Sequence, residues 1–385
     1  MNWKPRAVLL ASEVTHPVSR WRLVVAAVPR HLLVPRWWAR AEPGSLWHDT
    51  WELRDGPASP ARWLDAAYAD RSLITQVGEL HADHAGPAGR AARVVGDHAG
   101  TARPDVPARH DRRRRGRADV GTGSGYGTAL LATMLGDGHV TSIDLDDYLV
   151  KAAAARLASI GLHPVLAACD AAGPLPAEAE SFDRIIATVA VRPVPASWLT
   201  ALRPGGRLVT TITGTNLILT ADKTEDGGAA GRTEWDRAGF MHARQGRAYP
   251  PAMLERFTAI RDADGDQVTA GRFPVVNVND AWELYSTLGL VLPGIEHHYE
   301  QAPGGTRTAW MLHPDGSWAR SAALGDEPPV IHQAGPQRLH DVLDRLRSDW
   351  LRDGALPAHG ARVTISPDGG LTFRRGRWTA TIPAD

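Results

Sequence analysis

The sequence has a single cysteine, Cys169, among 385 residues, so it cannot form an intramolecular disulfide framework. It has no net charge either, since Lys+Arg 43 balances Asp+Glu 43, and this balance gives no indication of nucleic acid or a membrane surface as a partner. No stretch approaches the roughly 18 apolar residues of a membrane span, and the N-terminus has too short an apolar run for a signal peptide. We therefore expect a cytoplasmic chain with a large core, since 43% of its residues are hydrophobic.

Four regions differ in their sequence texture. Residues 1–85 mix helical and extended patterns and form a predicted N-terminal helical, substrate-side segment. Residues 86–117 are rich in Arg, Gly and Pro and have almost no large apolar side chain. Residues 118–213 alternate strand and helix patterns, and residues 214–385 indicate an accessory α+β domain with an amphipathic helix near 339–350 and a C-terminal hairpin.

The region 118–213 gives the clearest fold prediction. Strand patterns at 118–120, 140–144, 164–170, 182–190 and 207–212 are separated by helical patterns at 128–135, 147–160 and 196–202. Strands that alternate with helices at this spacing predict a parallel, doubly wound α/β sheet. In such a sheet a ligand binds beyond the carboxyl ends of the strands.

A glycine-rich loop, DVGTGSGYG, follows the first of these strands. Glycines at this turn let a ligand approach the backbone, and the amides at the start of the next helix point toward it. Asp144 ends the second strand, where a carboxylate can accept both hydroxyls of a ribose. The predicted cofactor-binding residues are Asp119, Gly121, Thr122, Gly123, Ser124, Gly125, Asp144 and Asp170.

The acidic residues distinguish between two adenosyl ligands. Asp119 lies two residues before Gly121, where an acid can hold the amino group of a methionine, and Asp170 can accept from an adenine amino group. These positions favour S-adenosyl-L-methionine as cofactor and a Rossmann-like class I methyltransferase fold. The alternative, a nicotinamide-dependent oxidoreductase, would need hydride-transfer residues after later strands, and none stands out.

The loop, together with VPRHLLVP upstream and FDRIIATVA, VRPVPASW and RPGGRLV downstream, resembles the protein-L-isoaspartate (D-aspartate) O-methyltransferase family. The resemblance covers roughly residues 21–213. It implies a protein or peptide substrate with an aspartyl or isoaspartyl carboxylate, and a cofactor pocket whose far edge is shaped by Val194 and Pro195. The C-terminal extension resembles, with HPDGSWAR and the segment 332–346, relatives that modify ribosomally made peptides.

Carboxyl methylation needs alignment more than acid–base chemistry, because a carboxylate is already a nucleophile. The family holds that carboxylate with a Ser/Thr-rich segment. The resemblance implies that this segment should fall in residues 86–117. Ser72, Thr75 and Gln76 lie where the family's chain approaches the substrate, and they are our candidate catalytic residues.

The family's segment and helix before the glycine loop are missing from residues 86–117, which have one Thr, four consecutive arginines and no Ser. We hypothesise that this stretch is read out of frame, which resequencing would test. A damaged, inactive or peptide-binding relative is therefore the alternative function. HADH (81–84) and EHH (296–298) lack repeated ligand spacing and indicate surface or loop histidines with no metal site. The sequence does not indicate an oligomeric state.

Overall fold

The computed structural model describes the whole chain except residues 1, 41–50, 78–79, 87–115, 242–253 and 385. Its centre is a ten-stranded mixed sheet in the order β19-β18-β17-β11-β10-β9-β8-β5-β6-β7. One half is parallel, as the sequence predicts, and comprises β5 (Gly116–Val120), β6 (Val140–Asp144), β7 (Val165–Ala168), β8 (Phe182–Val191) and β9 (Leu202–Ile212).

The helices of the parallel half follow the predicted pattern closely. They are α5 (Tyr126–Leu135), α6 (Asp147–Ser159) and α7 (Ala196–Ala201), with a short 3-10 turn at Asp137–His139. Gly161, shortly after the end of α6, has a positive φ of 78°, which favours glycine at a helix end. The α/β fold with a doubly wound parallel sheet is confirmed.

The other half of the sheet is antiparallel and comes from the stretch 214–385. It consists of β10 (Leu217–Lys223), β11 (Ala229–Arg237), β17 (Arg362–Ile365), β18 (Leu371–Arg375) and β19 (Trp378–Ile382). The predicted C-terminal hairpin is β17–β18, and it extends the central sheet by pairing with β11. How the chain divides into domains, with a boundary after residue 213, stays a prediction.

The part of the chain between β11 and β17 forms a second sheet of five antiparallel strands. Its order is β12-β16-β15-β14-β13, and its strands are β12 (Gln267–Ala270), β13 (Glu296–Gln301), β14 (Thr306–Leu312), β15 (Trp318–Leu324) and β16 (Val330–Ala334). We call these strands with α8 (Leu254–Ile260), α9 (Trp282–Val291) and α10 (Leu339–Asp353) the five-stranded module. The apolar face predicted for α10 packs on this sheet and α9, where Leu284, Leu288 and Leu343 are buried together.

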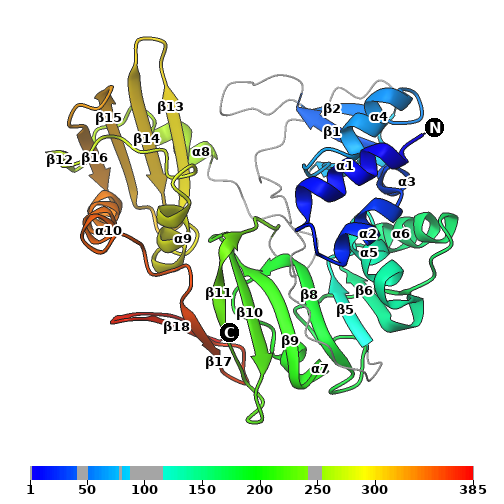
Figure 1. Cartoon of the computed structure of the whole chain (residues 1–385). Coiled ribbons are helices and arrows are strands. Elements are labelled where there is room, and N and C mark those ends of the chain that lie inside the picture. Colours follow the sequence, from blue (N-terminus) through cyan, green and yellow to red (C-terminus); the bar gives the residue numbers. More distant parts are fainter. Residues whose placement is uncertain (1, 41–50, 78–79, 87–115, 242–253, 385) are drawn as a thin grey trace.

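The N-terminal segment forms helices α1 (Lys4–Val14), α2 (Trp21–Ala27), α3 (Arg30–Leu33) and α4 (Pro60–Ala67), with strand pairs β1 (Arg36–Arg40)–β2 (Trp51–Asp55) and β3 (Gln76–Val77)–β4 (Leu80–His81) and a 3-10 turn at Ala82–His84. Pro29 lies between α2 and α3, where its missing amide interrupts the helical run. Buried residues of α1 and α2 share a core with α5, and in Figure 1 these helices and the five-stranded module lie on opposite sides of the view above the central sheet. None of the helices in the described ranges combines the length and apolar character that crossing a bilayer needs.

Candidate active site

The glycine loop turns sharply between β5 and α5. Gly121, Gly123 and Gly125 have φ values of 100°, 49° and 87°, which side chains rarely adopt. A Cβ on Gly121 would lie 2.7 Å from Thr188 Oγ1, whereas one on Gly123 would meet nothing closer than 4.0 Å. The loop therefore packs on β8 at its first glycine and leaves open space at its second, where a ligand could approach the backbone. Ser124 is half-buried between them and α5.

Asp144 connects the two loops that follow β5 and β6. Its Oδ2 accepts a hydrogen bond from the Gly123 amide at 2.9 Å, and its Oδ1 accepts from the Asp146 amide at 3.2 Å. Burial raises the pKa of the Asp144 carboxyl. Each carboxylate oxygen has a second lone pair, so the group can accept further hydrogen bonds from a diol while it holds the loop.

Asp119 lies deeper than the sequence suggests. Its side chain is buried, and Oδ2 accepts hydrogen bonds from Thr128 Oγ1 at 2.6 Å and from Ser142 Oγ at 2.9 Å. Burial raises the pKa of Asp119 to about 6. These bonds tie β5 to β6 and to α5, so the carboxylate supports the loop from below; its contact with a methionine amino group stays a prediction.

Asp170 lies beside the Asp144 loop on its other side. The amide of Cys169 donates to the Asp144 carbonyl at 2.9 Å, and the Asp170 carboxylate accepts from the Ala172 amide at 2.9 Å. Thr122, buried in the glycine loop, shares a hydrogen bond of 2.7 Å with Ser142. The predicted cofactor residues thus come together on three consecutive loops at the carboxyl ends of β5, β6 and β7.

The predicted substrate segment, Ser72 to Gln76, is held at both ends against this edge. Upstream, the Arg30 guanidinium donates to the carbonyls of Ala69 at 3.0 Å and Arg71 at 2.7 Å and lies 5.1 Å from the ring centroid of Tyr126, the first residue of α5. Downstream, the segment passes through β3 to β4, and the Thr75 carbonyl accepts from the Ala82 amide at 2.8 Å.

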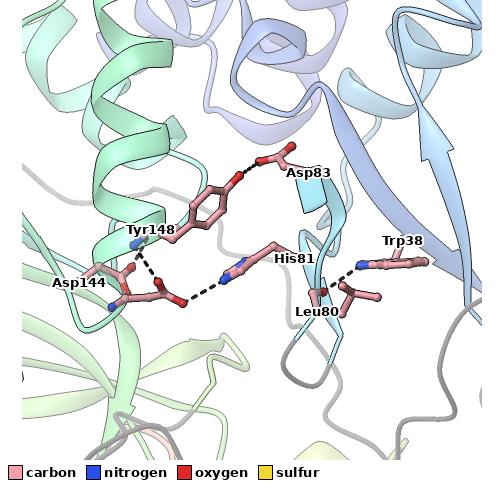
Figure 2. Close-up of polar contacts among 8 residues, drawn as sticks. Trp38, Leu80, His81, Asp83, Asp144 and Tyr148 are labelled. Atoms are coloured by element: carbon pink, nitrogen blue, oxygen red, sulfur yellow. Dashed lines mark hydrogen bonds and ion pairs between the residues drawn. The ribbon is translucent and has the colours of Figure 1, made fainter. Parts of the chain in front are cut away.

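The downstream end is fixed by His81 and Asp83 (Figure 2). His81 Nε2 lies 2.9 Å from Asp146 Oδ2, and the Tyr148 hydroxyl donates to Asp83 at 2.7 Å. Arg156 forms an ion pair with the same Asp83 carboxylate. We predicted a surface or loop histidine at position 81; its side chain is instead buried, because it docks on the N-terminus of α6. Ser72, Thr75 and Gln76 are half-buried between these two anchors, and their role stays a prediction.

Other residues singled out in the sequence have structural contacts. Asp183 is buried and pairs with Arg117 and Arg203, which fits a structural residue at a strand start. Val194 is fully buried, and Pro195 directly precedes α7. Within the described residues, no group of three or more His, Cys, Asp or Glu side chains could hold a metal ion. The anomalous stretch 86–117 lies mostly in residues 87–115, outside the described residues. Of this stretch the structure describes Gly86, which is exposed, and Gly116 and Arg117 at the start of β5.

Comparison with known proteins identifies the region around this site. Residues 114–238 match the family model for protein-L-isoaspartate (D-aspartate) O-methyltransferase. The protein-L-isoaspartate O-methyltransferase 1 of Anaeromyxobacter sp. (strain Fw109-5) is 39% identical over 28% of this chain and 52% of its own length. The corresponding enzyme of Anaeromyxobacter dehalogenans (strain 2CP-C) is 45% identical over 24% of this chain and 43% of its own length. The chain thus spans about half the length of these curated relatives.

Among solved structures, a protein-L-isoaspartate O-methyltransferase covers 98% of this chain and 98% of its own, at 14% identity and a TM-score of 0.42. That score is too low to support an inference about function.

Proposed function

We propose that the chain is an S-adenosylmethionine-dependent O-methyltransferase, because its residues 114–238 match the model of the protein-L-isoaspartate (D-aspartate) O-methyltransferase family and resemble curated members of it. Its acceptor is an aspartyl or isoaspartyl carboxylate of a protein or peptide. The observation that carries the proposal is the pairing of Asp144 with the Gly123 amide at 2.9 Å, on a loop whose backbone is open to a ligand.

The residues present fit an adenosyl cofactor. Asp144 offers carboxylate oxygens at the end of β6 for a ribose diol, and Asp170 lies at the end of β7, where it can accept from an adenine amino group. The cofactor can approach the backbone of the glycine loop at Gly121, Gly123 and Gly125. The loop is supported by Thr122, Ser124 and Asp119. When bound, the cofactor would supply an activated methyl group on a sulfonium.

The chain's own contribution to the reaction is alignment. The segment from Ser72 to Gln76 is anchored beside both cofactor loops, so Ser72, Thr75 and Gln76 can orient an acceptor carboxylate toward them. A carboxylate oxygen attacks without a base, so the site needs donors that hold it and a surrounding from which water is excluded. The absence of a His–Asp pair among the predicted catalytic residues is consistent with this chemistry.

Calorimetry with S-adenosylhomocysteine tests the cofactor half of the proposal. We expect binding by the wild-type chain, none of NAD, and a loss of affinity of about 100-fold in Asp144→Ala, because each hydrogen bond to a charged group contributes about 1.5–3 kcal/mol. Asp222→Ala is the control: Asp222 on β10, away from the cofactor loops, pairs with Arg207 on β9. NAD binding in place of S-adenosylhomocysteine would support the oxidoreductase alternative instead.

Methyl transfer from labelled S-adenosylmethionine to an isoaspartyl peptide tests the catalytic half. Thr75→Val should lower kcat/KM for the peptide and leave the affinity for S-adenosylhomocysteine unchanged. Cofactor binding without transfer to isoaspartyl or aspartyl peptides would support the non-catalytic, peptide-binding alternative. The genes beside this one would separate general repair from tailoring of one peptide.

A further inference from the structure

Arg192 joins the central sheet to the five-stranded module. Its two terminal nitrogens donate to the carbonyls of Gly289 at 2.8 Å and Leu290 at 3.2 Å. Both carbonyls belong to the last turn of α9, where backbone acceptors have no partner within the helix and the helix dipole is negative. The guanidinium therefore caps the C-terminus of α9.

The surface around this cap is closely packed. A Cβ on Gly289 would lie 2.0 Å from the carbonyl oxygen of Gly214, which lies two residues after the end of β9. On the same helix, Ser286 Oγ lies 3.0 Å from His359 Nε2, whose other ring nitrogen lies 3.1 Å from the Glu234 carbonyl. α9 is thus placed against the end of β9 by backbone contact and by two polar anchors.

The position of Arg192 relates α9 to the cofactor loop. Arg192 follows the last residue of β8, and Thr188 on the same strand donates to the Gly121 carbonyl at 3.0 Å. β8 thus contacts the glycine loop through Thr188, and the residue that follows β8, Arg192, contacts α9.

An apolar side chain could pack against α9 at lower cost than a buried guanidinium. Burial lowers the pKa of Arg192, and within the described residues no carboxylate pairs with it. The arginine fixes the orientation of α9, because its planar guanidinium can donate to both carbonyls in only one orientation of the helix.

We propose that Arg192 is a positioning residue for the methyl acceptor: by fixing α9 at the end of β8, it holds the five-stranded module as one wall of the acceptor site. The inference rests on the proposed function. The anchored segment 72–76 borders the loops after β5 and β6, and α9 borders the ends of β8 and β9, so the two flank the edge where ligands of such sheets bind. An acceptor that reaches this edge is a polypeptide contacted from both sides.

The test compares Arg192→Met with Arg347→Met. Arg347 is a matched control, because its guanidinium also donates to a carbonyl, that of Pro274 at 2.8 Å, and burial also lowers its pKa, but this contact lies within the five-stranded module. For Arg192→Met we expect the KM for an isoaspartyl peptide to rise about tenfold or more, because a displaced wall weakens peptide binding, and a loss of about 1.4 kcal/mol of binding is a tenfold change. The kcat at saturating peptide and the affinity for S-adenosylhomocysteine should stay within about twofold.

Two further variants keep the result interpretable if Arg192→Met folds poorly. Arg192→Lys retains a donor without the fork and should give an intermediate KM. Gly289→Ala keeps Arg192 but displaces α9 from Gly214, and it should raise the KM in the same direction.

The outcomes separate this inference from the proposed function. An equal rise of KM in Arg192→Met and Arg347→Met, an unchanged KM in Arg192→Met, or a parallel loss of cofactor affinity would overturn the positioning role alone. A wild-type chain that neither binds S-adenosylhomocysteine nor methylates peptides would remove the proposed function, and this inference with it.

Discussion

Two parts of the chain dock on the same edge of the central sheet, and they do so by different means. The N-terminal segment is held by charged and titratable side chains: His81 with Asp146, and Asp83 with Tyr148 and Arg156. The five-stranded module is held mainly by an arginine on backbone carbonyls and by the close approach of two glycines, with one neutral contact between His359 and Ser286.

The two kinds of contact differ in how strongly they depend on salt and on pH. Ion pairs at partly exposed sites weaken with salt and with the protonation of their acids. The contact of a guanidinium with backbone carbonyls involves no acid that could be protonated, and neither does the contact between two glycines. The strength of both contacts depends on how closely the surfaces fit. We therefore expect the substrate segment to be the adjustable side of the site and α9 the rigid side.

The largest effect is expected from a substitution that disrupts the contact between α9 and the central sheet. Gly289→Ala places a Cβ 2.0 Å from the Gly214 carbonyl, so α9 must move, and the free energy of unfolding should fall by about 2–3 kcal/mol. Gly304→Ala is the control, since a Cβ there meets nothing within 4 Å. Urea unfolding measures both; equal stability of the two variants would show that α9 is not closely docked.

A smaller loss of stability is expected when a charged contact of the N-terminal segment is removed. Asp83→Asn removes the charge that pairs with Arg156, whose side chain is 13% exposed, and should cost about 1–2 kcal/mol. Its control is Asp147→Asn, because the Asp147–Lys151 pair is mostly exposed and contributes about 0.5 kcal/mol or less. Limited proteolysis around residues 80–85 should rise in the first variant and not in the second; the reverse result would contradict a docking role for Asp83.

The smallest effect is a pH dependence of the contact between His81 and Asp146. Contact with His81 and with backbone amides outweighs burial and lowers the pKa of Asp146, so its stabilising contribution is present above the ordinary aspartate range. It is lost as the pH falls through the lowered pKa, below about pH 4. Asp146→Asn keeps the helix cap, because Asn also caps well. The difference in unfolding free energy between wild type and this variant should therefore shrink on acidification from pH 5 to pH 3. A difference that stays constant would show that the charge of Asp146 does not contribute.

The parallel half of the sheet could be predicted from the sequence because its signals are local. Apolar strands and glycine stops are patterns of a few residues, and Asp119, Asp144 and Asp170 lie within about fifty residues of one another. The predicted strand 140–144 matches β6 residue for residue. The supporting hydroxyls of Thr128 and Ser142 were missed. Their signal was a hydroxyl residue within an otherwise apolar helix or strand, which at a buried position needs a partner.

The antiparallel half could not be predicted in the same way. β11 pairs with β17, so Gly231 lies opposite Val363, and no local pattern reports a partner so distant in sequence. Arg192 was missed for the same reason, since its carbonyl partners lie almost a hundred positions further along. His81 looked like a loop residue because its partner Asp146 is on another element.

The pairing of β11 with β17 also has a consequence for how the chain is made. On the ribosome, β11 emerges long before β17, because the whole five-stranded module is synthesised between them. At about 5–20 residues per second, its outer edge stays without its partner strand for several seconds or more. Open strand edges are the places where chains aggregate. The order of synthesis thus leaves this edge of β11 open to wrong pairing until the last strands of the chain are made.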